Sequence, residues 1–182
     1  MLFRSKRFCH WLTEKERRAG QLGERDEYRL PTDLEWSAAV DLVKETGATP
    51  AERDGKIPDV YPWGKEWPPP KNVGNYDEEL RRDIFDYTSP VGSFPANRHG
   101  LHDLGGNVWE WCQDSYDGQQ DYRVLRGASW HSSKPHTLLS SARLFNSPGH
   151  RVDIVGFRIV LEARRDRKST RLNSSHEWIS RM

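Results

Sequence analysis

The spacing of apolar side chains predicts an amphipathic helix near the start of the chain. In residues 5–19, Phe8, Trp11 and Leu12 fall on one helical face, while the charged side chains fall on the others. Gly20 follows as a suitable stop signal, because glycine readily adopts the left-handed conformation that ends many helices. We therefore expect this helix to pack on the domain through its aromatic face.

A second helix is predicted to begin after Thr32. Thr32 and Glu35 have the spacing of a capping box, in which each side chain binds the backbone N–H of the other. Leu34, Ala38 and Leu42 then recur at helical spacing, so we expect these three residues to form the buried stripe.

Short strands are expected over residues 107–113, 124–130 and 157–161. In the first of them, Trp109 and Trp111 alternate with Glu110, so both indoles should share one face and the carboxylate the other. Residues 47–70 are rich in Gly, Pro and charge, and predict an ordered loop held by Trp63 and Trp67. The pattern as a whole predicts an α+β, loop-rich domain.

Composition limits the size and the partners of this domain. The chain has 182 residues, 35% hydrophobic and 30% charged, which suits one domain with a real core. Its net charge of +1 is dispersed, so nothing indicates nucleic-acid binding, and no apolar run approaches the length of a membrane span. Cys9 and Cys112 lie in patterned aromatic segments and are expected to be buried free thiols. The cellular compartment stays open.

The segment GLHDLGGNVWEWCQD, from Gly100 to Asp114, is the most distinctive of the chain. Gly105 and Gly106 allow backbone carbonyls to turn toward a common point. Together with Asp103 and Glu110 they offer the hard oxygen donors that Ca²⁺ prefers. An ordinary turn followed by an aromatic strand is the alternative interpretation.

This segment also carries a resemblance to a known family. Together with VLRGASW (124–130), SAR (141–143) and GFRIV (156–160), it resembles the formylglycine-generating enzyme, or sulfatase-modifying factor, family. Upstream segments match in the same order: FCHWLTEKER (8–17), YRLPTDLEW (28–36), YPWG (61–64) and PVGSFPAN (90–97). The resemblance runs from about Phe8 to Leu161 and implies a C-type-lectin-like fold of the formylglycine-generating-enzyme subtype.

The resemblance also implies boundaries for the domain. Members of the family carry a substantial segment before the FCxWL helix, so we expect Met1 to be an internal start, with residues 1–165 forming the C-terminal part of the domain. Residues 166–182 lack any helical or strand period and resemble a translated sequencing adapter. We expect this tail to be disordered and not native.

Two structural calcium sites are implied by the family. At the glycine loop, Asp103 and Glu110 match side-chain ligands, and Gly106 and Val108 match backbone carbonyls. The residues that match the other site are Asn75 and Asp83 by side chain and Tyr76 and Phe85 by carbonyl. Such ions would cross-link distant loops of a domain with few regular elements. Local hydrogen bonds and ion pairs of Asp83 and Glu110 are the alternative.

The catalytic part of the resemblance fails. The formylglycine-generating enzymes oxidise a substrate cysteine with a copper ion held by two thiolates, which follow the RGGS[WY] motif. Here Ser129 matches the serine of that motif, Ser132 replaces the first cysteine, and no cysteine follows Cys112. Because soft Cu(I) needs soft ligands, we expect no copper and no copper-dependent formylglycine formation. The catalytic residues, if any, stay unknown.

Other chemistries find less support. His99, His102, His131 and His136 could in principle hold iron or zinc, but loop histidines this scattered usually face solvent or form hydrogen bonds. Ser129, His131 and Asp114 have the residue types of a serine hydrolase without its G-x-S-x-G turn. Three arginines within apolar motifs are expected to bridge carbonyls and carboxylates, namely Arg126, Arg143 and Arg158.

Two functions remain open at this stage. The first is a sulfatase-modifying-factor-like domain, related to formylglycine-generating and non-haem iron oxidoreductases. Such a domain would act on a protein or peptide, together with other domains of a longer parent chain. The second is a non-catalytic lectin-like module. In the second case the loop of residues 130–151 would present a peptide- or glycan-binding surface. Whether the chain is an enzyme is not decided by its sequence.

Overall fold

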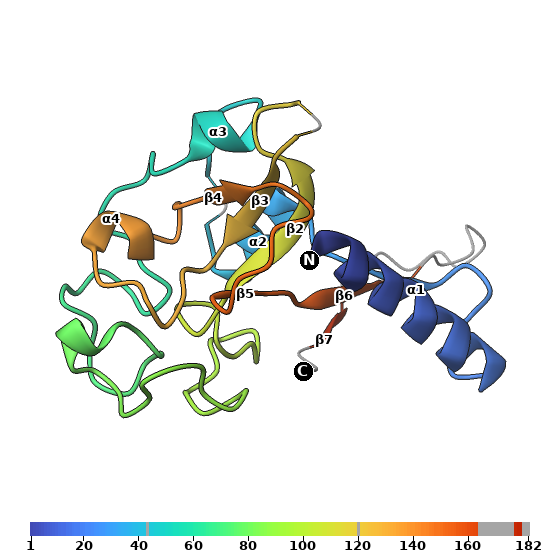
Figure 1. The fold of residues 1–182 in the computed structure, drawn as a ribbon, viewed down its shortest axis with the longest axis horizontal. Helices are drawn as coiled ribbons and strands as arrows, with labels where there is room; N and C mark the ends of the chain where they lie inside the picture. The colour runs from blue at the N-terminus through green and yellow to red at the C-terminus, as the bar shows by residue number, and fades with distance from the viewer. Residues whose placement is uncertain (43, 120, 164–176, 180–182) are drawn as a thin grey trace.

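The computed structural model describes residues 1–42, 44–119, 121–163 and the backbone of 177–179 (Figure 1). The helices are α1 (Leu2–Arg18), α2 (Asp33–Ala39), α3 (Pro50–Arg53), the 3₁₀ helix η1 (Glu78–Leu80) and α4 (Pro135–Leu138). The strands are β1 (Glu27–Arg29), β2 (Trp109–Ser115), β3 (Arg123–Arg126), β4 (Leu144–Asn146), β5 (Val155–Gly156), β6 (Ile159–Glu162) and β7 (Glu177–Ile179).

Two small sheets organise these elements. One has the strand order β4-β3-β2-β5, with β2 antiparallel to β3 and parallel to β5. The other has the order β1-β6-β7, with both pairs antiparallel. In Figure 1, α1 and the smaller sheet lie to one side, while the larger sheet, α2 and the long loops form the other. The mixed, loop-rich architecture agrees with the predicted α+β class.

The first helix forms as predicted but buries a narrower face. It ends at Arg18, and Gly20 follows in the left-handed conformation with a φ of 69°. Leu12 is buried, whereas the Trp11 side chain is 53% exposed, so its predicted burial was wrong. Trp11 instead packs along the helix against Phe8, at 5.6 Å between ring centroids.

The capping box of α2 is confirmed, but the predicted stripe is wrong. The Thr32 hydroxyl accepts from the Glu35 backbone N–H, and the Glu35 carboxylate accepts from the Thr32 backbone N–H. Leu34 is 55% exposed and Ala38 is also exposed, although Leu42 is buried. The inward face is instead formed by Asp33, Trp36, Ser37 and Ala39. The spacing of apolar residues does not reveal this face, because the face includes the charged residue Asp33, whose arginine partners are also buried.

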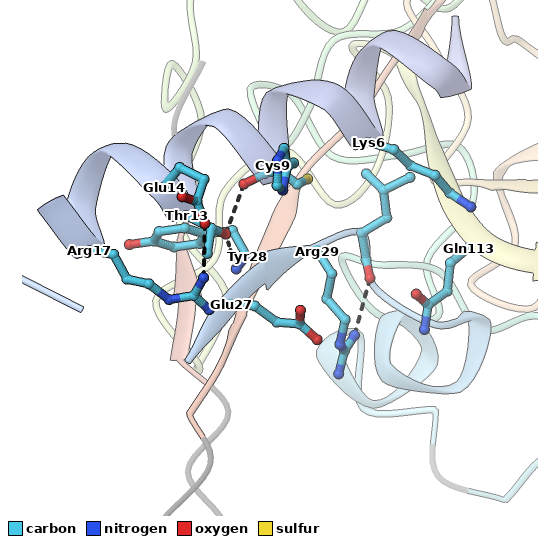
Figure 2. Close-up of a pocket in the computed structure, with 11 residues that line it drawn as sticks. Lys6, Cys9, Thr13, Glu14, Arg17, Glu27, Tyr28, Arg29 and Gln113 are labelled. Atoms are coloured by element: carbon cyan, nitrogen blue, oxygen red, sulfur yellow. Dashed lines mark hydrogen bonds and ion pairs between the residues drawn. The ribbon is translucent and has the colours of Figure 1, made fainter. Parts of the chain in front are cut away.

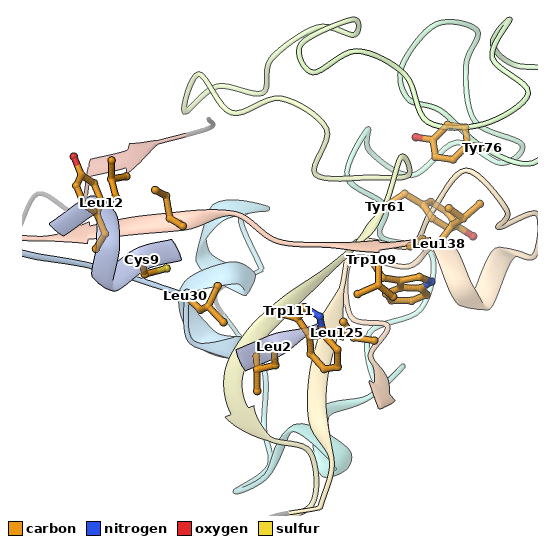
Figure 3. Close-up of a cluster of buried hydrophobic side chains, with 14 residues drawn as sticks. Leu2, Cys9, Leu12, Leu30, Tyr61, Tyr76, Trp109, Trp111, Leu125 and Leu138 are labelled. Atoms are coloured by element: carbon orange, nitrogen blue, oxygen red, sulfur yellow. The ribbon is translucent and has the colours of Figure 1, made fainter. Parts of the chain in front are cut away.

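Strand β2 crosses the centre of the core. Trp109 and Trp111 are buried on one face, as predicted, and Glu110 on the other face is buried as well. Figure 3 shows the two indoles beside Leu125 of β3. Strand β3 ends at Arg126, before the predicted residue 130, because Gly127 turns the chain away with a φ of 95°.

The long loop of residues 47–70 packs against the domain through its aromatic side chains, as predicted: Trp63 and Trp67 pack against the larger cluster of buried apolar side chains, and the Trp63 ring lies 5.3 Å from Tyr76. The Trp63 ring stacks on Tyr61 at 4.9 Å, and Trp67 lies 5.5 Å from the same Tyr61 ring. Trp63 also donates its indole N–H to the Glu66 carbonyl at 2.9 Å.

The structure describes little of the C-terminal tail. Of the tail predicted to be disordered, residues 166–182, all but the backbone of β7 lies outside the described residues. No helix within the described ranges combines the length and the apolar character needed to cross a bilayer.

Candidate functional site

Two serine hydroxyls lie side by side in the loop after β3. The Oγ atoms of Ser129 and Ser132 are 3.4 Å apart, and the Ser129 backbone N–H donates to the Ser132 Oγ at 3.2 Å. Both residues are buried. The backbone N–H of Trp130 donates to the Asn107 carbonyl at 2.8 Å, which fixes this loop to the glycine loop. The structure therefore brings together the two serines that the sequence placed in the active-site region of the family.

The cysteines lie in separate parts of the core. Cys9 on α1 belongs to the larger cluster of buried apolar side chains, and Cys112 on β2 belongs to the smaller one with Trp36 and Val124. Both thiols are free and buried, as predicted. Burial raises the pKa of Cys9 to about 11 and also raises the pKa of Cys112, so both are protonated near neutral pH. They do not form the adjacent thiolate pair that Cu(I) requires, so the donor set does not fit copper.

A row of three aromatic rings adjoins the serine pair: Tyr87, Trp130 and His131. The Trp130 ring lies 5.2 Å from Tyr87 and 5.3 Å from His131. The side chains of Tyr87 and His131 are both 68% exposed. His131 Nδ1 lies 3.2 Å from the Asp77 carboxylate, whose residue in turn donates its backbone N–H to the Ser132 carbonyl at 3.2 Å. This aromatic row and its acidic partner were not predicted, because Tyr87 and Asp77 both lie more than forty residues before Trp130 and His131 in the sequence.

The other candidate groups for catalysis are engaged elsewhere. Asp114 accepts the Asp33 backbone N–H at 2.7 Å, and burial raises its pKa. His99 contacts the Asp41 carboxylate at 2.7 Å, and His102 contacts the Phe94 carbonyl at 2.7 Å. These contacts confirm the expectation of hydrogen-bonded loop histidines. Within the described ranges, no three His, Cys, Asp or Glu side chains are grouped as metal ligands.

At the glycine loop, Glu110 is bound by an arginine. Arg158 donates to both carboxylate oxygens, at 2.6 and 2.7 Å, and the Trp36 indole N–H adds a third bond at 2.9 Å. The same guanidinium donates to the carbonyls of His102 at 3.0 Å and Asp103 at 3.3 Å. Burial alone would lower the pKa of Arg158, but the Glu110 charge outweighs it and the pKa lies above its usual value. Glu110 is thus neutralised within the protein.

Two other buried oxygens of the predicted calcium sites have no hydrogen-bond partner among the described residues. They are Asn75 Oδ1 and Asp103 Oδ1. The Asn75 amide group donates to the Tyr87 carbonyl at 2.7 Å, and the second Asp103 oxygen accepts the Gly92 backbone N–H at 2.8 Å. A Cβ at Gly106 would collide with the Asn75 carbonyl oxygen, so the glycine permits close contact of the two predicted sites.

The residues named for the second predicted site lie close together in the sequence, between 75 and 85, on both sides of η1. The Asp83 carboxylate accepts the backbone N–H groups of Tyr76 at 2.9 Å and Phe85 at 3.0 Å. Oxygen atoms of carboxylates, amides and carbonyls are the ligands that Ca²⁺ prefers, and the open Asn75 oxygen fits that chemistry. At the glycine loop the fit is mixed: one Asp103 oxygen has no partner among the described residues, but Glu110 is already paired with Arg158. The Val108 side chain packs against Gly156 of β5.

A cluster of charged residues surrounds Asp33, the first residue of α2. We call it the arginine cluster, and its members are Asp33, Glu45, Arg53, Arg126 and Arg143. Asp33, which is fully buried, forms ion pairs with Arg53 at 3.0 Å, with Arg143 at 2.9 Å and with Arg126. Arg143 also pairs with Glu45 at 2.6 Å. Together with the Arg158–Glu110 pair, this confirms the predicted structural roles of the three arginines. Asp33 itself was missed, because an aspartate in the first turn of a helix normally faces solvent.

Known proteins with similar sequences belong to the family that the motifs indicated. The sequence profile of the "Sulfatase-modifying factor enzyme 1-like domain" matches residues 3–163. The chain is 37% identical to the mouse protein named "Inactive C-alpha-formylglycine-generating enzyme 2" over 150 residues, which cover 77% of this chain and 45% of that protein. It is 30% identical to the formylglycine-generating enzyme of Streptomyces coelicolor over 162 residues, covering 74% of this chain and 47% of the relative.

A solved structure has a similar fold. PvdO from Pseudomonas aeruginosa superposes with a TM-score of 0.62 at 24% identity, over 87% of this chain and 58% of that one. The likeness agrees with the predicted formylglycine-generating-enzyme subtype of the C-type-lectin-like fold. The chain spans less than half the length of the curated relatives described above.

Proposed function

Because the chain belongs to the sulfatase-modifying factor enzyme 1-like family, we propose that it is a formylglycine-generating-enzyme-type domain without copper-dependent formylglycine formation. The observation that carries the proposal is the pair of buried hydroxyls, Ser129 and Ser132, in the region where the family enzymes hold copper. The name of the mouse relative, which describes that protein as inactive, points in the same direction.

The physical reason is the chemistry of the donor atoms. When copper is bound in the family enzymes, it supplies the oxidation of a substrate thiol, and its Cu(I) state is held by soft thiolate ligands. Neutral hydroxyl groups are hard, weak donors, so they do not substitute for thiolates. What Ser129 and Ser132 can do is donate and accept hydrogen bonds with one another, with the backbone and with a bound partner.

We test this with the purified chain, reduced copper and a peptide containing Cys-x-Pro-x-Arg. Copper binding is measured by competition with a chromogenic Cu(I) chelator, and the aldehyde product by mass spectrometry. We expect no tight copper binding and no aldehyde above the level of a control without protein. Stoichiometric Cu(I) uptake with aldehyde formation would overturn the proposal. A Ser132→Cys variant serves as a reference, because it restores one soft ligand at the same position.

A binding module is the second candidate, and the aromatic row favours it. Exposed aromatic rings beside hydrogen-bonding groups are typical of surfaces that bind protein or peptide segments. A partner would contact Tyr87, Trp130 and His131, and it would come from another protein or from a further domain of a longer chain. A Ser-x-Pro-x-Arg peptide, which cannot be oxidised at a thiol, separates binding from chemistry. Binding that is lost in Trp130→Ala would support the module, and equal binding in that variant would exclude this surface.

We further propose that calcium stabilises the domain through the two sets of residues named for it. The open Asn75 and Asp103 oxygens and the turn around Asp83 support this, while the Arg158–Glu110 pair makes Glu110 the weakest of the ligands. Element analysis of the purified chain and thermal unfolding with and without a chelator provide the test. We expect bound calcium and a lower melting temperature after chelation. An unchanged melting temperature would refute calcium binding at both sites.

A further inference from the structure

A groove of about 340 Å³ runs between α1 and β1, its lining does not include the serine pair, and its floor is neutral. Cys9, Thr13 and Tyr28 form part of this floor and are all buried. The Thr13 hydroxyl donates to the Cys9 carbonyl at 2.9 Å and accepts the Tyr28 backbone N–H at 2.8 Å, so its hydrogen bonds are satisfied. The Cys9 thiol stays protonated. The floor therefore offers shape and apolar contact but no reactive group.

Most charged groups of the groove are already paired. Arg29 binds Glu35 at 2.7 Å and Glu162 at 2.7 Å, and Arg17 binds Glu14 at 3.0 Å. Arg29 is thus bound by two carboxylates, and Arg17 by one carboxylate and by the Asp26 carbonyl at 2.8 Å, so their donors are largely occupied within the protein. The binding preference of the groove therefore depends on its remaining polar groups.

Three hydrogen-bonding side chains of the lining have no such partner within the described part of the chain: Lys6, His10 and Gln113. Lys6 and His10 are four residues apart on α1, so they project from the same face of the helix. Figure 2 shows Lys6 and Gln113 at one end of the pocket, and Glu14, Arg17 and Glu27 toward the other. The end at Lys6 thus carries an exposed ammonium that forms no ion pair among the described residues, and Gln113 lines the same end of the groove.

We propose that this end of the groove binds a carboxylate group, with the Lys6 ammonium as its counter-ion. His10 and the Gln113 amide supply further hydrogen bonds, and the neutral floor at Cys9 and Leu30 accommodates the apolar part of the ligand. The carboxylate belongs to a small organic acid or to an acidic side chain of a peptide. This site is independent of the serine pair and of the proposed calcium ligands.

The test uses the full chain with propionate, and with propionamide as a neutral probe of the same shape. Two-dimensional ¹H–¹⁵N NMR spectra report on the backbone amides of Cys9, Thr13, Tyr28 and Leu30 along the floor. We expect propionate to shift these signals saturably and propionamide to leave them unchanged. N-acetyl-glutamate amide, compared with propionate, shows which of the two sources binds more tightly. Either order supports the proposal.

Variants make the test specific. Lys6→Met should weaken propionate binding by about ten-fold, the loss of one charge-assisted hydrogen bond. Lys15→Met removes the same charge from the same helix outside the groove and should leave binding unchanged. Gln113→Met provides a second change inside the groove and should weaken binding less. Absence of saturable shifts, equal shifts with propionamide, or undiminished binding by Lys6→Met would each overturn the proposal.

Discussion

Asp33 and Asp103 both have buried carboxylate oxygens, but the protein compensates their negative charges differently. Asp33 is surrounded by three guanidinium groups, and Glu110 is likewise bound by Arg158. Asp103 keeps one buried oxygen without a partner among the described residues, and Asp83 accepts the backbone N–H groups of Tyr76 and Phe85. The arginine-bound carboxylates are thus compensated by the polypeptide itself, whereas Asp103 keeps an oxygen that the described residues leave unpaired, and Asp83 has no arginine partner among them.

The largest effect is expected at the arginine cluster. Asp33→Asn removes the charge that Arg53, Arg126 and Arg143 share. Arg143 keeps its ion pair with Glu45, whereas the buried guanidinium groups of Arg53 and Arg126 lose their carboxylate partner. Breaking a buried ion pair from one side costs about 3–5 kcal/mol, so the free energy of unfolding should fall by about that amount or the chain should fail to fold. Urea unfolding measures the loss. Asp117→Asn, at an exposed position, is the matched control and should change stability little.

A smaller loss is expected at Glu110. Glu110→Gln keeps the shape and one oxygen acceptor but removes the charge opposite Arg158. Hydrogen bonds to charged groups contribute about 1.5–3 kcal/mol each, and we expect a loss of unfolding free energy in that range. The same urea experiment measures it. An unchanged stability would mean that Glu110 is compensated by something other than Arg158, and the comparison with Asp103 would no longer hold.

The carboxylates without arginine should respond to calcium instead. For the wild-type chain, free calcium at 100 times the dissociation constant of a site should raise the free energy of unfolding by about 2.7 kcal/mol for that site. Asp83→Asn should lose most of the gain that comes from the site around Asp83 and keep the gain from the glycine loop, and in chelator it should differ from wild type by only about 1 kcal/mol. Calorimetry with and without calcium distinguishes the two. A gain of equal size in the variant would remove Asp83 from the proposed ligands.

The smallest effect concerns a half-buried pair, Glu35 with Arg29. Burial alone would raise the pKa of Glu35, but the hydrogen bonds from Arg29 and from the Thr32 backbone outweigh it and lower the pKa from 4.5 to about 2. A lowered pKa in the folded state adds stability that is complete above pH 4.5 and is lost as the pH falls toward 2. In Glu35→Gln, stability measured over this pH range should fall less steeply than in wild type. Parallel curves for the two proteins would contradict this assignment.

Local signals were read well from the sequence, and contacts between distant segments were not. The capping box at Thr32 and the alternation around Glu110 each depend on neighbouring residues, and both are confirmed. The buried stripe predicted on α2 was wrong, since Leu34 faces solvent while Asp33 faces inward. The reason is that burial of Asp33 is favourable only because Arg126 and Arg143 arrive from elsewhere in the chain.

The candidate site divides in the same way. Sequence motifs were sufficient to identify the family, to place Ser129 and Ser132 together and to show that no cysteine stands at either position. The pairing of His131 with Asp77 and the groove beside Lys6 were not visible, because nothing in a linear pattern states which side chains remain unpaired after folding.

The sequence by itself thus determined the family, the cap and turn chemistry and the types of donor atom available to a ligand. These depend on residue identity and on short-range spacing. Only the tertiary structure decided which charges neutralise one another, and therefore which oxygens and which ammonium group remain available. The physical reason is that compensation of a buried charge is a property of the space around it, and that space is filled by residues that lie far away along the chain.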